Sequence, residues 1–273
     1  MKNLLELKNA RRVLVEGNVF EYSWRDPVPR DGQLYSIVFT VRNQEGSAPW
    51  SLVQDITFRL NTVRHVQGGV GILTCDDNIL GQCQSRTTNR ILIENNVFED
   101  MSVVKWGSNG SDMANAIAIN NFVVDPSSRT WEFDVNHNTM CPDNKVSSAQ
   151  DETDLTGTLN FFRNNIITRG TLGVWGRGVT EGNPAIDQYL PGLNFIRNDI
   201  IEADNAIYPA SNGFTFSPNI AAVRFMNFAG CNGGNYRLQP GAPGKNAGTD
   251  GKNLGADIDL LDAATAGTIS GVW

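Results

Sequence analysis

The stretch RILIENNVF (residues 90–98) decides the fold, because five close variants of it recur along the chain. The variants are RVLVEGNVF (12–20), DITFRLNTV (55–63), EFDVNHNTM (132–140), TLNFFRNNI (158–166) and GLNFIRNDI (192–200). We align the six units on one shared asparagine, which is Asn18, Asn61, Asn96, Asn138, Asn164 or Asn198. Every unit then has apolar residues five and three positions before the asparagine and two positions after it; in the fifth unit these are Leu159, Phe161 and Ile166.

Apolar residues two positions apart indicate a β-strand with one buried face. The asparagine marks a sharp change of direction, since asparagine tolerates a left-handed backbone and its side chain binds nearby amides. A unit of this size cannot bury its apolar face alone and must stack on copies of itself. The repeat therefore predicts an all-β protein, a right-handed parallel β-helix (solenoid) of about seven coils.

Stacking of the coils would bring the aligned asparagines together inside the turns. Asparagine side chains in neighbouring coils can hydrogen-bond as a ladder, which satisfies turn amides that would otherwise be buried and unpaired. We therefore expect these asparagines to have a structural role and not to bind a ligand.

The chain is assigned to one domain. Residues 1–232 form the coils, and residues 233–273 form a Pro/Gly-rich C-terminal capping strap. The first residues already have a strand-like pattern, and Leu4-Leu5 is followed at once by Glu6, so no secretory leader is expected in this chain. We expect further N-terminal coils to be missing, and the protein to be a monomer or to associate weakly through its open first coil.

The composition argues against several kinds of partner. The chain of 273 residues has 22 Lys and Arg against 29 Asp and Glu, a net charge of −7, with no basic run for nucleic acid or an anionic membrane. No apolar run reaches the length of a membrane span. A disulfide between Cys75 and Cys83 would close a short polar loop, but the spacing of these residues, Cys141 and Cys231 equally allows four unpaired thiols. There is no CxxC pair to indicate structural zinc.

The VLVEGNVF-type coils resemble those of secreted bacterial right-handed parallel β-helix proteins of the pectate-lyase-like group. The tail GGNYRLQPGAPGKNAGTDGKNLGAD (233–257) resembles the closing segment of such proteins, in which a Tyr-containing strand precedes a strap over the open end. The stretch TVRNQEGSAPWSLVQDITFRLN resembles a loop of environmental bacterial members. This resemblance implies an extracellular protein that interacts with a polysaccharide, such as a plant or acidic glycan.

The segments that follow the repeats are expected to form the next strand of each coil. They are SIVFTVRN (36–43), the stretch from Val70 to Asn78, VVKWGSNG (103–110), LGVWGRG (172–178) and NAIYPAS (205–211). Because the coils stack in register, the strand ends should line up as one surface strip. The strip would contain Arg42, Asp76, Asp77, Lys105, Trp106, Trp175, Arg177 and Tyr208, with Trp50 at its edge. Inward packing of Trp106 and Trp175 remains an alternative.

The chemistry of this strip suits sugars, because exposed aromatic rings stack on pyranose faces while charged groups bind hydroxyls or carboxylates. Asp76 and Asp77 could share Ca²⁺, and Arg42 or Lys105 could be the base of a polysaccharide lyase. An acidic turn in which the two carboxylates cap amides is the alternative. Hydrolysis in the polygalacturonase manner is less favoured, because the Gly-His-Gly and Arg-Ile-Lys patterns of those enzymes do not occur here.

The two histidines of the chain are the remaining candidates for catalytic residues. His65 could reach the strip as a base or be a turn residue without a chemical role, and His137 is expected to be structural. Catalysis thus stays open, with a non-catalytic carbohydrate-binding module and a structural or adhesive solenoid as alternatives. An enzyme predicts that Asp76, Asp77 and a cationic base converge, a binding module predicts exposed aromatic rings, and a structural protein predicts buried tryptophans.

Overall fold

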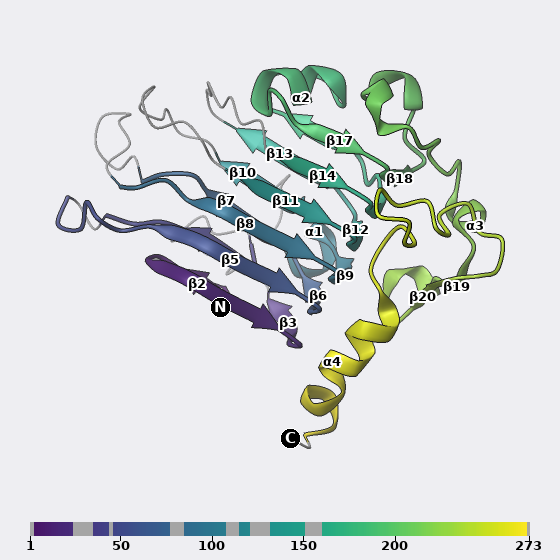
Figure 1. The fold of residues 1–273 in the computed structure, drawn as a ribbon, viewed down its shortest axis with the longest axis horizontal. Helices are drawn as coiled ribbons and strands as arrows, with labels where there is room; N and C mark the ends of the chain where they lie inside the picture. Colours follow the sequence, from purple (N-terminus) through teal and green to yellow (C-terminus); the bar gives the residue numbers. More distant parts are fainter. Residues whose placement is uncertain are drawn as a thin grey trace.

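The computed structural model describes residues 3–23, 35–43, 46–76, 85–107, 115–120, 132–150 and 160–271. Three parallel sheets of six strands each stack into a solenoid (Figure 1). Each coil adds one strand to each sheet in the same order, so the described residues contain six three-stranded coils, where the sequence predicted about seven. The predicted right-handed parallel β-helix is confirmed.

The sheets are named A, B and C in the order in which the chain visits them. Sheet A contains β1 (Leu5–Leu7), β4 (Ile37–Thr40), β7 (Val70–Leu73), β10 (Asn115–Asn120), β13 (Lys145–Gln150) and β16 (Val174–Gly176). Sheet B contains β2 (Ala10–Glu16), β5 (Val53–Arg59), β8 (Asn89–Glu94), β11 (Phe133–Asn136), β14 (Phe161–Arg163) and β17 (Asn194–Ile196). Sheet C contains β3 (Val19–Ser23), β6 (Thr62–Val66), β9 (Val97–Met101), β12 (Thr139–Pro142), β15 (Ile166–Thr168) and β18 (Asp199–Ile201).

The alternating apolar residues of each repeat form the core, as the pattern predicts. On sheet B, Val15 pairs with Phe58, and Phe58 pairs with Ile93. The Phe58 ring is fully buried and lies between Phe20 and Phe98 of sheet C, with ring centroids 5.8 and 6.4 Å away. Apolar residues thus stack coil on coil, and each buries its neighbour.

A ladder of asparagine side chains runs through the corner between sheets B and C. In each coil the backbone N–H of the ladder asparagine donates to the side-chain Oδ1 of the next. The N–O distances are 3.0 Å for Asn18–Asn61, 2.9 Å for Asn61–Asn96, 3.0 Å for Asn96–Asn138, 2.9 Å for Asn138–Asn165, 3.2 Å for Asn165–Asn198 and 2.8 Å for Asn198–Asn212. The side-chain amides donate to backbone carbonyls of the preceding coil, as Asn96 does to Phe58. The predicted structural role of the asparagines is therefore confirmed.

In the fifth unit the ladder uses Asn165, so the alignment on Asn164 was wrong by one residue. Phe162 is the buried residue that pairs with Val135 and Phe195, whereas Phe161 pairs with polar neighbours and is half-buried. A shift of one residue exchanges the two faces of a strand. The sequence misled because it contains three doublets, Phe161-Phe162, Asn164-Asn165 and Ile166-Ile167, which make both registers look equally apolar.

The last coil is closed by residues 203–217. This segment contains the short 3-10 helices η1 (Asn205–Ile207) and η2 (Ala210–Asn212), and it places Tyr208 and Phe216 against the end of the core. Asn212 supplies the last rung of the ladder, since its Oδ1 accepts the N–H of Asn198. Helix α2 (Asn183–Tyr189) packs on β16 at the same end.

The rest of the chain returns along the outside of the coils (Figure 1). After α3 (Ile220–Val223) come β19 (Phe225–Asn227), the 3-10 helix η3 (Ala229–Cys231) and β20 (Asn235–Leu238), and β19 and β20 form an antiparallel hairpin. Residues 245–257 follow the corner between sheets B and C, and α4 (Ile258–Ser270) continues along it to the first coil. There the Thr268 hydroxyl donates to the Gly17 carbonyl at 2.8 Å, and a Cβ on Gly17 would lie 2.6 Å from the Ala264 carbonyl oxygen. The strap thus follows the length of the solenoid and does not only close its end.

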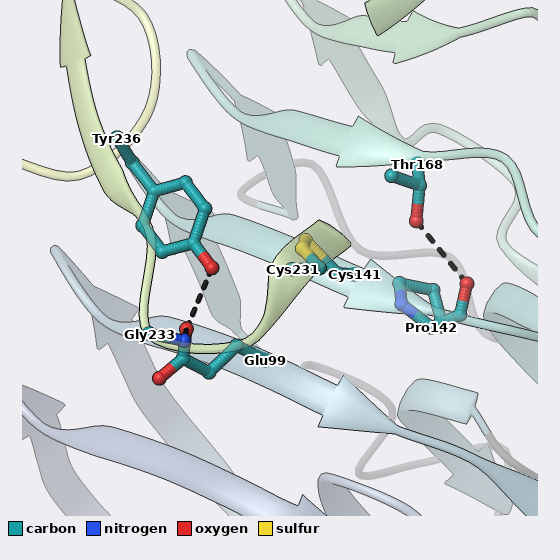
Figure 2. Close-up of a disulfide and its surroundings, with 7 residues drawn as sticks. All are labelled: Glu99, Cys141, Pro142, Thr168, Cys231, Gly233 and Tyr236. Atoms are coloured by element: carbon teal, nitrogen blue, oxygen red, sulfur yellow. Dashed lines mark hydrogen bonds between the residues drawn. A yellow bond between two sulfur atoms is a disulfide. The ribbon is translucent and has the colours of Figure 1, made fainter. Parts of the chain in front are cut away.

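Two contacts fix the hairpin to the outer face of sheet C (Figure 2). A disulfide joins Cys141 of β12 to Cys231. The buried carboxylate of Glu99 on β9 accepts hydrogen bonds from the Tyr236 hydroxyl at 2.6 Å and the Gly233 N–H at 2.8 Å. Burial and the adjacent Glu99 charge raise the pKa of Tyr236, so its hydroxyl stays a donor at neutral pH. Cys75 is also disulfide-bonded, and its expected partner Cys83 lies outside the described residues.

No helix in the described ranges combines the length and the apolar character that crossing a membrane requires.

The ladder gives a first prediction. Asn96→Ala leaves the buried N–H of Asn61 without its side-chain acceptor and removes a donor to the buried carbonyl of Phe58, so we expect a loss of about 2–4 kcal/mol in the free energy of unfolding. Asn18→Ala, at the half-buried first rung, should cost only about 1 kcal/mol. Chemical denaturation of both variants measures the difference. Equal losses would show that ladder position does not govern the contribution.

The hairpin contact gives a second prediction. Tyr236→Phe removes a donor to a buried carboxylate and should lower the free energy of unfolding by about 1.5–3 kcal/mol. Tyr22→Phe is the matched control, because the Tyr22 hydroxyl has no hydrogen bond to any described residue, and its effect should stay within about 0.5 kcal/mol. Urea unfolding at neutral pH tests both. A Tyr236→Phe variant as stable as wild type would contradict the assigned role.

Candidate functional site

The residues of the predicted strip do not lie on one surface. Arg42 and Asp76 follow strands of sheet A, as expected. Lys105 and Trp106 instead lie in α1 (Val103–Trp106), a helical turn capped by the Ser102 side chain, and the sheet A strand of that coil is β10. The segment around Tyr208 likewise forms 3-10 turns and no strand. The expectation that these segments all form the next strand was therefore wrong for two of them.

The Arg42 and Asp76 side chains form an ion pair, but both carboxylate oxygens of Asp76 are occupied by hydrogen bonds within the turn. Asp76 is fully buried, and its two carboxylate oxygens accept from Arg42 Nη1 at 3.0 Å and from the Asn43 N–H at 2.6 Å. This is the arrangement of an acidic turn whose carboxylate caps amides, the alternative that the sequence left open. Asp77, the other expected Ca²⁺ ligand, lies outside the described residues. Within the described residues, no group of three His, Cys, Asp or Glu side chains could hold a metal ion.

Tyr208 is not a surface residue, so its predicted contact with a sugar is wrong. Only 3% of it is exposed, and its ring stacks on Phe195 with centroids 5.7 Å apart. Its hydroxyl accepts from the Val174 N–H at 3.1 Å and donates to Glu181 at 2.7 Å. Burial raises the pKa of Tyr208, with a smaller contribution from the Glu181 charge. The last coil needs an apolar cover, and Tyr208 supplies part of it.

The remaining residues of the strip are Trp50, Trp175 and Arg177. Trp50 is 62% exposed and follows β4 on a turn of its own. Trp175 is half-buried in β16, and the Lys145 ammonium lies 4.2 Å from its ring centroid. One face of the Trp175 ring is therefore already covered by a cation. Arg177 is exposed just after β16, and its carbonyl accepts from the Tyr189 hydroxyl.

A cluster of chemically active groups forms instead on the outer side of sheet C. Lys105 Nζ donates to Asp100 Oδ1 at 2.6 Å, and His65 Nδ1 lies 2.8 Å from Asp100 Oδ2. The Tyr22 ring stacks on His65 with centroids 4.8 Å apart, and Trp106 lies 5.6 Å from His65 and edge-on to Tyr22 at 6.1 Å. We call these five residues, Tyr22, His65, Asp100, Lys105 and Trp106, the His65 cluster.

Three members of the His65 cluster come from the same position of three successive coils. Tyr22, His65 and Asp100 each have a left-handed backbone, with φ of 62, 55 and 45°. The residues on either side of them are in register from β3 to β6 to β9. A left-handed residue within a strand bends the backbone and redirects its side chain. Three such bends in register thus place an aromatic ring, an imidazole and a carboxylate in one column.

The charges of the His65 cluster are fixed by Asp100. Burial raises the pKa of Asp100, but hydrogen bonds from Lys105 and His65 outweigh burial, and the pKa is lowered overall. Asp100 is therefore a carboxylate at neutral pH and orients the imidazole through Nδ1. The other ring nitrogen of His65, Nε2, makes no hydrogen bond with the described residues, and 15% of the side chain is exposed. Half of Tyr22 and 59% of the Lys105 side chain face solvent.

Sequence reasoning found part of this cluster. Lys105 and Trp106 were predicted site residues, and His65 was considered as a base, but Tyr22 and Asp100 were missed. Their position in the repeat could have indicated them, since Tyr22, His65 and Asp100 each follow the ladder asparagine of their own coil by four residues. His137, predicted to be structural, contacts Asp250 of the strap through Nε2 at 3.1 Å.

Comparison of the chain with protein-family models, with curated proteins and with solved structures finds no match.

The Asp100 contacts predict a pH dependence. Because the folded pKa of Asp100 lies below 3.8, its stabilising effect is complete above about pH 4 and is lost as the pH falls through the folded pKa. Asp100→Asn should be less stable than wild type by about 1 kcal/mol at pH 6, and this deficit should be smaller at pH 3, below the ordinary pKa of an aspartate.

Unfolding by urea at the two pH values tests this prediction. Asp187→Asn, at an exposed carboxylate with no hydrogen bond to the described residues, is the control and should differ little from wild type at either pH. An Asp100→Asn deficit that persists at low pH would mean that the carboxylate charge is not its cause.

Proposed function

We propose that the protein is an extracellular polysaccharide-binding β-helix that holds a glycan chain at the His65 cluster. The observation that carries the proposal is the half-exposed Tyr22 ring beside His65 and Trp106, in a cluster where the Lys105 ammonium is held by Asp100. A sugar ring presents an apolar face and a rim of hydroxyls. An aromatic surface with a few fixed polar groups matches both.

The cluster is held in place before any ligand binds. Tyr22, His65 and Asp100 belong to strands that pair on neighbouring coils, and Trp106 is the last residue of α1, a helical turn with a side-chain cap. A site that is already ordered loses little conformational entropy on binding, which favours affinity for a flexible glycan.

The charge that faces solvent favours an acidic glycan. Only 6% of the Asp100 side chain is exposed, against 59% for Lys105. The neighbouring Arg64 and Glu21 pair at 2.7 Å and are exposed to the same extent, so their charges offset each other. The accessible charge of the cluster is thus positive, and a sugar carboxylate is the group that Lys105 would bind best.

The disulfide supports the extracellular setting of this proposal. Cys141 and Cys231 are joined over a sequence separation of 90 residues, and Cys75 is also bonded. Disulfides persist in oxidising compartments and are rare in reducing ones.

Affinity electrophoresis in gels that contain acidic or neutral glycans tests the proposal. We expect retardation by an acidic glycan, and at least an about tenfold loss of affinity in Tyr22→Ala and in Trp106→Ala. Trp50→Ala is the matched control, because Trp50 is exposed but lies away from the His65 cluster, and its affinity should equal that of wild type. Absence of retardation on every glycan, or an equal loss in Trp50→Ala, would contradict the proposal.

Cleavage of the bound glycan is the second candidate function, and the His65–Asp100 pair favours it. A carboxylate on Nδ1 orients an imidazole whose Nε2 can take a proton. In an elimination, Nε2 would take the C5 proton of a uronate, the C4–O bond would break, and a C4–C5 double bond would form. The leaving oxygen would receive a proton from water.

Ultraviolet absorbance of the unsaturated product distinguishes cleavage from binding. An enzyme should lose at least about 100-fold in rate in His65→Gln while still being retarded in the glycan gel. Retardation of wild type without any product would leave a binding module. The Ca²⁺ dependence expected from Asp76 and Asp77 is read in the same assay with and without a chelator.

A further inference from the structure

A cavity of about 530 Å³ lies where the strap passes between the hairpin and the corner of sheets B and C. It is lined by β20, by strap residues between 245 and 257, by the first residues of α4, and by Asn95 and His137 of the corner. We call it the strap cavity. Its volume falls within the range of about 300–1,000 Å³ that is usual for small-ligand sites. None of its lining residues belongs to the His65 cluster, so the two sites are separate.

The walls of the strap cavity are fixed by contacts within the protein. Asp250 of the strap lies 3.1 Å from His137 Nε2. Arg237 of β20 donates to Asp259 and Asp262 of α4 at 2.8 and 2.6 Å. The strap is thus tied to the corner and β20 is tied to α4 before any ligand binds. A preformed site loses little conformational entropy when a ligand enters it.

Asparagine side chains supply free hydrogen-bond donors along these walls. Asn95 Oδ1 accepts from the Asp257 N–H, and Asn253 Oδ1 accepts from the Asn246 N–H, both at 3.1 Å. Asn235 Oδ1 accepts from a backbone N–H of β20 at 3.2 Å. The Nδ2 groups of Asn95, Asn235 and Asn253 make no hydrogen bond with the described residues, and neither does the side chain of Asn246. The strap cavity therefore offers several amide donors to the oxygen atoms of a ligand.

The charges around the strap cavity disfavour an acidic ligand. Three cations and four carboxylates lie on its walls or pair with residues there, namely Arg237, Lys245, Lys252, Asp250, Asp257, Asp259 and Asp262. Lys245 and Asp257 are exposed and form no ion pair with the described residues. Asp257 Oδ1 accepts from the Leu260 N–H, which leaves Oδ2 as a free acceptor. A hydroxyl group can accept from Lys245 and donate to Asp257, whereas a carboxylate could only accept.

Two exposed apolar side chains also line the strap cavity. Met226 of β19 is 54% exposed, and Leu260 of α4 is 52% exposed. Apolar surface beside a few fixed polar groups is the usual composition of a small-ligand site. It suits a molecule that has both an apolar face and many hydroxyl groups.

We propose that the strap cavity is a second carbohydrate site, which binds a neutral sugar. The C–H face of the sugar packs on Met226 and Leu260. Its oxygen atoms accept hydrogen bonds from the asparagine Nδ2 groups and from Lys245, and one hydroxyl donates to Asp257. The site goes beyond the proposed function, because it shares no residue with the His65 cluster and selects the other charge class of sugar.

Nuclear magnetic resonance of methionine methyl groups tests where the sugar binds. The complete chain, labelled with ¹³C at these methyl groups, is titrated with neutral tetrasaccharides of glucose, mannose, galactose and xylose. We expect at least one of them to shift the Met226 resonance saturably, with a Kd of about 1 mM. Met101 and Met140 are buried in the core and should not shift. The variant Met226→Leu assigns the resonance. No Met226 shift with any neutral tetrasaccharide, or an equal shift with a galacturonate tetrasaccharide, would overturn the proposal.

Two variants of α4 give a matched comparison. Leu260→Ala should weaken binding at least about fivefold, as read from Met226. Ile269→Ala should leave the affinity unchanged, because Ile269 is 70% exposed on the same helix but does not line the strap cavity. Asn246→Gly removes a free amide at a residue with a φ of 54°, which glycine tolerates, and should weaken binding at least about threefold. Circular dichroism verifies that each variant is folded. Unchanged affinity in Leu260→Ala or Asn246→Gly, or an equal loss in Ile269→Ala, would contradict the assignment.

The two carbohydrate sites can be tested separately. Tyr22→Ala should keep the Met226 shift with the neutral sugar, and Leu260→Ala should keep its retardation by an acidic glycan. Failure of the strap cavity to bind would therefore leave the proposed function of the His65 cluster standing, and the reverse holds as well. A loss of both activities in either single variant would overturn the separation of the sites.

Discussion

The buried corner between sheets B and C is the constraint on which the rest of the structure depends. A chain that turns inside its own core must give every peptide N–H and C=O a partner, because an unpaired group there costs as much as several apolar contacts contribute. One asparagine in each coil meets this requirement. Its side chain accepts from one neighbouring coil and donates to backbone carbonyls, so each rung, from Asn61 to Asn198, depends on the next.

This ladder also sets the register of everything around it. Once the asparagines align, residues at a fixed distance from them align too, whatever the length of the loops between coils. The His65 cluster is a direct consequence, since Tyr22, His65 and Asp100 stand at the same distance from their ladder asparagines and share a left-handed backbone. The scaffold thus brings chemically different side chains together by position.

The segment after the last coil closes one end of the solenoid. Residues 203–217 close one end with Tyr208, Phe216 and the last rung of the ladder. The hairpin is then fixed to sheet C by the Cys141–Cys231 disulfide and by Glu99, and α4 returns to the first coil (Figures 1 and 2). One end of the core is therefore sealed by the chain itself, and the strap connects that end to the first coil along the outside of the solenoid.

The sequence by itself determined the parallel β-helix, the inward-facing residues and the role of the asparagines, because these follow from a local pattern that each coil repeats. Only the tertiary structure decided between Asn164 and Asn165, since the doublets of the fifth unit satisfy the local pattern in either register and pairing with Val135 and Phe195 selects one. It also separated Lys105 from Asp76 and buried Tyr208. Those residues follow the repeats at variable distances, and the fold of each connecting segment depends on its contacts with neighbouring coils, which no single repeat encodes.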